Sequence, residues 1–178
     1  MTSQTQTPGI DFAALTLKDA FDLAVLIEEE ARDRYEELSA QLVLHRTPGA
    51  AAFFAKMVRI EELHRQQLLE ERKKHFNDQP VAVRREMIFD VEAPDYDEAR
   101  ADMTTRQALE AALRSEEKAH RFFVSVLSHV QKPEVRRLFE ELRDEEVEHQ
   151  QLVKAELAKL PPDDRFARVD VSDGPAPQ

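Results

Sequence analysis

Six residues of the sequence have the types and spacing expected of a metal centre. They are Glu28, Glu61, His64, Glu116, Glu146 and His149. Four of them form two Glu-x-x-His pairs, and a separation of three residues places both side chains of a pair on one face of a helix. Each such helix can offer a carboxylate and an imidazole to the same metal ions. The chemistry to expect is that of metal held by oxygen and nitrogen.

The two remaining acids interrupt apolar stripes. Glu28 lies in a heptad series with Phe21, Tyr35 and Leu42, and Glu116 holds the corresponding place in a later helix. A carboxylate that is buried in ionised form without a partner costs several kcal/mol, and four such groups would also repel one another. Two divalent cations would balance the four negative charges. The pattern therefore predicts two bound metal ions.

The absence of cysteine from the sequence narrows the metal chemistry. It excludes a thiolate zinc site, an iron–sulfur cluster and a thiol nucleophile. Carboxylate together with imidazole suits iron or manganese. The expected cofactor is two iron ions per chain, with manganese as the alternative. If Glu61 and Glu146 bridge the two ions, positions stay open for O₂, peroxide or water, which favours chemistry or metal transit over a structural role.

Four amphipathic helices are predicted to position these residues. Capping boxes start the first helix at Thr16 and the third at Thr104. Pro48 and Pro133 suit the first positions of the second and fourth helices, and Thr47 is the expected cap of the second. The predicted ranges are about 16–44, 48–76, 104–130 and 133–160.

The second pair of helices repeats the first pair. Glu28 lies 88 positions before Glu116, and Glu61 lies 85 positions before Glu146, as expected of a duplicated helical hairpin. Residues 77–103 are interrupted by prolines and are predicted to form a long connection. A helix of roughly 27 residues is about 40 Å long, so this connection can cross the whole bundle. The expected fold is an all-α, ferritin-like four-helix bundle of two antiparallel helical hairpins joined by a long crossover.

A resemblance to one family follows from these motifs. The segment from Glu28 to Tyr35 has the pattern Glu-x-x-Ala-Arg-x-Arg-Tyr, and together with Glu61-x-x-His64 it resembles the rubrerythrins, over residues 16–160. The resemblance implies that Tyr35 is a hydrogen-bonding group beside the metal ligands. It also implies terminal ligands at Glu28 and Glu116, bridging ligands at Glu61 and Glu146, and nitrogen ligands at His64 and His149.

The sequence departs from the rubrerythrin pattern in three ways. It lacks the four cysteines of the rubredoxin-like module that typically delivers electrons. Ala119 stands where the third helix usually offers an extra glutamate, and Phe123 stands where a second tyrosine is expected. These departures favour iron oxidation, or another O₂-consuming role, over peroxide reduction.

Composition excludes several other classes of protein. A net charge of −11 argues against a nucleic-acid partner, because phosphate binding needs a basic surface. The start of the chain lacks the basic and apolar regions of a signal peptide, and no apolar run approaches the roughly 20 residues of a membrane span. We therefore expect a cytoplasmic protein with no membrane partner. Residues 1–15 and 161–178 are predicted to be tails on either side of the domain.

Three further residues are weaker candidates for a part in metal transit. Glu71 and Glu156 also match at the offset of 85 and could mark a path for metal, but a repeated acidic helix end is the preferred interpretation. His120 lies four residues after Glu116, yet its repeat equivalent is Arg32, so a position at the rim is preferred.

Three hypotheses about function are compatible with the sequence. The leading one is a di-iron oxidoreductase that oxidises Fe²⁺ with O₂ or H₂O₂ in defence against oxidative stress, with an unidentified electron donor in trans. The second is a non-enzymatic protein that stores or senses iron or manganese. The third is a metal-free helical module whose core acids are protonated or paired. The resemblance also implies a homodimer.

Overall fold

A computed structural model of the chain describes residues 9–44, 47–88, 91 and 103–161. Within these residues the elements are α1 (Leu17–Leu44), α2 (Pro48–Phe76), a short 3₁₀ helix η1 (Arg85–Met87), α3 (Thr105–Leu127) and α4 (Pro133–Lys159), with no strand. The predicted all-α class is therefore confirmed. None of the helices in this part of the chain is both long enough and apolar enough to cross a lipid bilayer.

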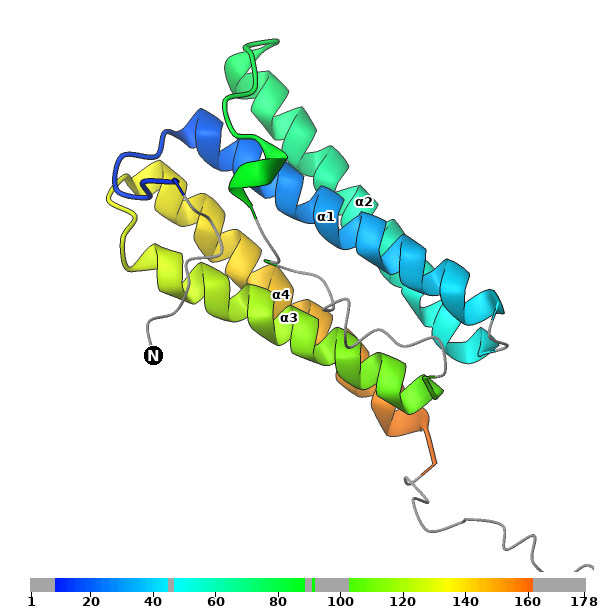
Figure 1. Cartoon of the computed structure of the whole chain (residues 1–178). Coiled ribbons are helices and arrows are strands. Elements are labelled where there is room, and N and C mark those ends of the chain that lie inside the picture. Colours follow the sequence, from blue (N-terminus) through cyan, green and yellow to red (C-terminus); the bar gives the residue numbers. More distant parts are fainter. Residues whose placement is uncertain (1–8, 45–46, 89–90, 92–102, 162–178) are drawn as a thin grey trace, which may run out of the picture.

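The helices form two antiparallel pairs, as predicted. Packing is closest within the pairs, α1 with α2 and α3 with α4, and the pairs lie against each other with α2 and α3 running in the same direction (Figure 1). The end of α2 and the start of α3 therefore lie at opposite ends of the bundle. Nearly half of the predicted connection, residues 89–90 and 92–102, lies outside the described residues. On either side of it Ile88 and Met103 are buried in opposite halves of the core.

Two of the predicted helix starts have the expected hydrogen bonds. Thr104 and Gln107 form a reciprocal capping box at α3, with N–H to oxygen distances of 3.2 and 2.9 Å. Thr16 caps α1 by accepting the backbone N–H of Asp19 at 3.2 Å. Thr47 is the N-cap residue of α2, as predicted, but its side chain makes no capping hydrogen bond. Its hydroxyl donates to the carbonyl of Met103 at 3.4 Å instead, and α2 starts at a proline that has no N–H to satisfy.

The end of α3 also differs from the prediction. The helix ends at Leu127, three residues before the predicted Val130. Arg136 from the start of α4 explains the difference, because its guanidinium donates to the carbonyls of Leu127 and Val130 at 2.9 and 2.8 Å. The arginine satisfies carbonyls that a helix end leaves open, and so stabilises a tight turn into α4.

The apolar core is divided into two clusters. One fills the half of the bundle around the start of α1, and the other fills the half around its end. Part of the predicted N-terminal tail adds to the first cluster, since Phe12 packs edge-on against Phe122 and Phe139 with ring centroids 6.2 and 6.3 Å away. Residues 9–15 thus cover one end of the bundle, whereas residues 1–8 and 162–178 of the predicted tails lie outside the described residues.

A buried ion pair fixes the chain that leaves α2. Asp22 in α1 accepts a hydrogen bond from Arg72 in α2, and both residues are buried. The same carboxylate accepts the backbone N–H of Ala82 at 3.1 Å and the ammonium of Lys18 at 2.8 Å. Arg72 also donates to the carbonyl of Gln79 at 2.8 Å. The start of the crossover is therefore held against the first helix.

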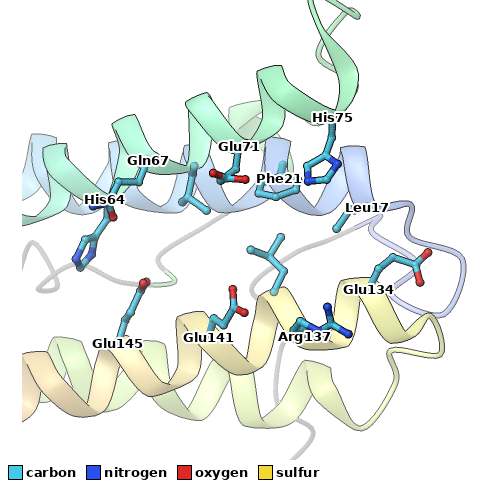
Figure 2. A pocket seen from close by; sticks show the side chains of 12 residues that line it. Leu17, Phe21, His64, Gln67, Glu71, His75, Glu134, Arg137, Glu141 and Glu145 are labelled. Carbon is cyan, nitrogen blue, oxygen red and sulfur yellow. The ribbon is translucent and has the colours of Figure 1, made fainter.

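The two helix pairs leave an open groove between α2 and α4. Its volume is about 530 Å³, and its lining changes from His64 and Glu145 at the inner end to His75 and Glu134 near the end of the bundle (Figure 2).

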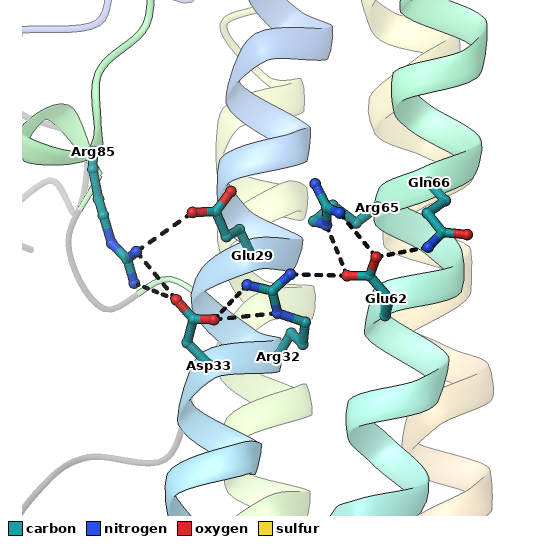
Figure 3. A network of polar contacts seen from close by, with 7 residues as sticks. All are labelled: Glu29, Arg32, Asp33, Glu62, Arg65, Gln66 and Arg85. Atoms are coloured by element: carbon teal, nitrogen blue, oxygen red, sulfur yellow. Dashed lines mark hydrogen bonds and ion pairs between the residues drawn. The ribbon is translucent and has the colours of Figure 1, made fainter.

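A network of charged side chains covers the outer face of α1. Arg32 binds Glu62 of α2 at 2.9 Å, and Arg85 of η1 binds Asp33 at 3.2 Å (Figure 3). Arg65 also contacts Glu62, at 2.8 Å. The network joins α1, α2 and η1, although exposed ion pairs of this kind contribute only about 0–1 kcal/mol each.

Candidate metal centre

The six residues predicted to bind metal lie close together at mid-bundle, between the two apolar clusters. Five of them are almost completely buried, with exposed fractions of 0% for Glu61 and Glu116, 2% for Glu146, and 3% for Glu28 and His149. His64 is the exception, with a side chain that is 17% exposed. The heptad positions explain this arrangement, because each helix contributes its polar residues from the same inward stripe as its core residues.

The ligand atoms of these residues face a common space. His149 Nδ1 lies 3.2 Å from Glu116 Oε2 and 3.8 Å from carboxylate oxygens of both Glu61 and Glu146. His64 Nδ1 lies 3.9 Å from Glu28 Oε2 and 4.0 Å from Glu61 Oε2. The two imidazoles are stacked, with centroids 5.1 Å apart and planes 6° apart.

Three clusters of ligand atoms, each within 4.8 Å, are present among the described residues. They are Glu61 with His64 and His149, Glu116 with Glu146 and His149, and Glu28 with His64 and Glu145. Glu61 is the carboxylate that accompanies both imidazoles, which is the placement expected of a group between two metal ions. The arrangement can therefore hold two ions that share ligands.

Glu145 is the member of these clusters that sequence reasoning missed. It is adjacent to the predicted ligand Glu146, and its repeat equivalent is Ile60. A search for residues that occur in both halves of the repeat therefore passes over it. The helical wheel of α4 offers a signal, because Glu145 precedes His149 by four residues and shares a face with it.

Burial dominates the electrostatics of the centre. Burial, opposed by the charge of His149 and supported by that of Glu145, raises the pKa of Glu28 to about 8. Burial also lowers the pKa of His64 to about 4. Burial alone would lower the pKa of His149, but the hydrogen bond and charge of Glu116 outweigh it and raise that pKa. Burial raises the pKa of Glu145 as well.

Several ligand atoms have no hydrogen-bond partner among the residues that the structure describes. They include Glu28 Oε2, His64 Nδ1 and His149 Nε2. A buried polar atom left in this way costs about 1–3 kcal/mol, and native proteins contain few of them. Bound cations would satisfy these atoms and offset the repulsion between carboxylates. The residues present therefore fit a pair of metal ions.

The tyrosine singled out by the resemblance lies beside the centre. Tyr35 is fully buried, stacks on Phe54 with centroids 5.5 Å apart, and donates its hydroxyl proton to Glu116 Oε1. Its repeat equivalent, Phe123, is buried and has no hydroxyl to offer. Ala119, at the position of the expected extra glutamate, is likewise buried. The centre is therefore asymmetric despite the repeat.

The weaker candidates for metal transit have different places in the structure. Glu71 lines the groove between α2 and α4, where it also binds Lys74 at 2.5 Å (Figure 2). Glu156 binds Lys159 at 2.7 Å and is not among the groove residues. His120 belongs to none of the three ligand clusters found among the described residues.

Fold and site together define a ferritin-like helical bundle with carboxylate and histidine clusters that could bind metal. The rubrerythrin family model matches residues 19–157, and the chain belongs to the rubrerythrin family. No match was found among curated proteins. A crystal structure of an uncharacterized conserved protein from Magnetospirillum magnetotacticum MS-1 is similar in fold, with a TM-score of 0.65 and 24% sequence identity. The similarity covers 83% of this chain and 97% of that one.

Proposed function

We propose that the protein is a di-iron oxidoreductase that oxidises Fe²⁺ with O₂ or H₂O₂, in iron handling and defence against oxidative stress. The observation that carries this proposal is the convergence of four glutamates and two histidines at one level of the bundle, five of them almost fully buried. Membership of the rubrerythrin family supports it.

The placement of the residues suggests how they divide the work of holding two ions. Glu28 and His64 would hold one ion, and Glu116 and His149 would hold the other. Glu61, which accompanies both imidazoles, would lie between them. When bound, iron would supply the redox chemistry, in which two Fe²⁺ become two Fe³⁺ and give up two electrons. With two protons, these electrons would convert one H₂O₂ into two waters, or one O₂ into H₂O₂.

The rest of the protein would prepare the site for this chemistry. The two apolar clusters exclude water from both ends of the ligand layer. Tyr35 orients the Glu116 carboxylate through its hydrogen bond. The groove leaves His64 as the ligand with partial access to solvent, so small oxidants and Fe²⁺ would reach the site from this side.

The second candidate function is storage or sensing of iron or manganese without turnover. The same ligand clusters favour it, because they fit two ions whether or not the ions react. For either function we propose a homodimer in the cytoplasm, and for the oxidoreductase also an electron donor in trans.

Anaerobic titration with Fe²⁺, followed by exposure to O₂ or to H₂O₂, tests the proposal. Two Fe²⁺ bound per chain and rapid appearance of Fe³⁺ absorption would support the oxidoreductase. Binding without oxidation would support storage or sensing, and absence of binding would exclude both. Glu61→Ala should lose binding and oxidation together, whereas Glu148→Ala, on the exposed side of α4, should match the parent.

A further inference from the structure

The two halves of the centre differ at one repeat position. An offset of 85 residues relates Glu61 to Glu146 and His64 to His149, but it relates Glu145 to Ile60. The half of the centre that contains Glu28 and His64 therefore receives an additional carboxylate from α4. The half that contains Glu116 and His149 receives no equivalent group.

Glu116 and Glu28, the two acids proposed as terminal ligands, also differ in their hydrogen bonds, and here Glu116 has more partners. Glu116 already accepts a hydrogen bond from Tyr35 and lies 3.2 Å from His149 Nδ1. Glu28 is 3% exposed, and its Oε2 atom has no hydrogen-bond partner among the described residues. The repeat equivalent of Tyr35 is Phe123, which cannot donate to it. Glu28 is hydrogen-bonded to Glu61, but its Oε2 atom is left without a partner from the described part of the protein.

Side chains from three helices meet around Glu28 Oε2. Glu28 Oε2 from α1 and His64 Nδ1 from α2 lie 3.9 Å apart, and neither has a hydrogen-bond partner in the described part of the chain. A carboxylate oxygen of Glu145 from α4 lies within 4.8 Å of ligand atoms of both residues. Two carboxylates and one imidazole at these distances can converge on one divalent cation with little rearrangement.

We propose that Glu145 is a seventh ligand of the centre, and that it serves only the metal position next to Glu28 and His64. This inference rests on the proposed metal centre. Its consequence is that the two metal positions are not equivalent. The position with Glu145 has more negative charge and more ligands, whereas the other position has a terminal acid that Tyr35 holds in place.

The groove between α2 and α4 also makes Glu145 one of the first ligands that an entering ion would meet. His64 and Glu145 face each other from α2 and α4 at the inner end of the groove, while Glu71 and Glu141 point into it further out (Figure 2). Glu116 and His149 do not line it. An ion that enters through the groove therefore meets Glu145 and His64 before it meets the other ligands, so the position with Glu145 fills first.

Calorimetric titration with Fe²⁺ under argon can test this inference. The parent should bind two ions with different affinities. Glu145→Gln keeps the size of the side chain but removes its charge, and it should weaken one of the two ions by at least about tenfold while the other changes little. Glu145→Ala should do the same, with unchanged helical circular dichroism as the check on folding. Glu141→Gln, one turn further out in the same groove, is the matched control and should leave both affinities within about twofold.

The outcomes separate this inference from the proposed function. If the parent binds fewer than two ions, the metal centre itself is wrong, and the inference with it. If the parent binds two ions and Glu145→Gln binds both with parental affinities, only the inference is overturned. Equal weakening by Glu141→Gln would also overturn it, because the effect would then be one of general charge and not of ligation.

Discussion

The phenol of Tyr35 in α1 donates a hydrogen bond to the Glu116 carboxylate in α3, across the interface between the two helix pairs. Both residues are fully buried. Because the repeat places Phe123 where a second tyrosine would bind Glu28, this bond has no counterpart in the other half of the centre. The Tyr35–Glu116 hydrogen bond therefore both joins the two helical hairpins and makes the two halves of the candidate metal centre different.

Tyr35→Phe should lower the stability of the metal-free protein. A buried hydrogen bond to a charged acceptor contributes about 1.5–3 kcal/mol, and the loss should appear as a lower free energy of unfolding in urea. In a Glu116→Gln background the same substitution should cost less, since the charged acceptor is gone. Equal losses in the two backgrounds would show that the Tyr35 hydroxyl stabilises the protein independently of Glu116.

Much of the fold is predictable from the sequence because local signals agree with tertiary packing. Prolines at the starts of α2 and α4, the capping box at Thr104 and the interrupted heptads all identify helices that the structure contains. The features that the sequence does not predict depend on residues from other parts of the chain. Arg136 ends α3 early by binding its carbonyls, and Thr47 donates to Met103 across 56 positions. A local sequence pattern cannot indicate hydrogen-bond partners of this kind.

The residues of the candidate site are likewise only partly predictable from the sequence. The repeated Glu-x-x-His pairs identify residues that lie together at mid-bundle, since duplication combined with a place on an apolar face excludes acids that merely cover a helix surface. The same filter removes Glu145, which has no equivalent in the first hairpin and belongs to a cluster only because α4 faces His64 of α2. The metal-ligand roles of all these residues stay predictions.

Asp22→Asn should destabilise the protein through its buried ion pair with Arg72. Leaving one member of such a pair without its partner costs about 3–5 kcal/mol, and here the start of the crossover would also lose its anchor. The double variant with Arg72→Met should lose less than the sum of the single variants, as measured by urea denaturation.

The effect of Asp22 should also depend on pH. Burial opposes ionisation, but hydrogen bonds from Arg72, Lys18 and Ala82 lower the pKa of Asp22 below its ordinary 3.8. A depressed pKa means that the stabilisation is present above pH 3.8 and is lost as the pH falls through the folded-state value. The difference in stability between the parent and Asp22→Asn should therefore shrink in acid. A constant difference down to pH 2 would contradict this account.

The metal-free protein should become less stable as the pH rises from 6.5 to 8. In this range Glu28, with a pKa of about 8 against an ordinary 4.5, still holds a proton when folded and has lost it when unfolded. His149, whose pKa is raised above 6.5, acts in the same direction. His64, with a pKa near 4, acts in the opposite direction only below pH 6.5. Melting temperatures of the chelator-treated protein would measure this slope, and Glu28→Gln should reduce it.

Glu61→Ala should abolish the stabilisation of the protein by metal. Glu61 is fully buried and accompanies both imidazoles, so its removal leaves neither ion with a complete ligand set. At a metal concentration about 100 times the Kd of both ions, the parent should melt about 10–20 °C higher under argon with Fe²⁺ than without it. Glu148→Ala should show the same rise, and Glu61→Ala none. An equal rise in the parent and in Glu61→Ala would place the bound metal elsewhere in the protein.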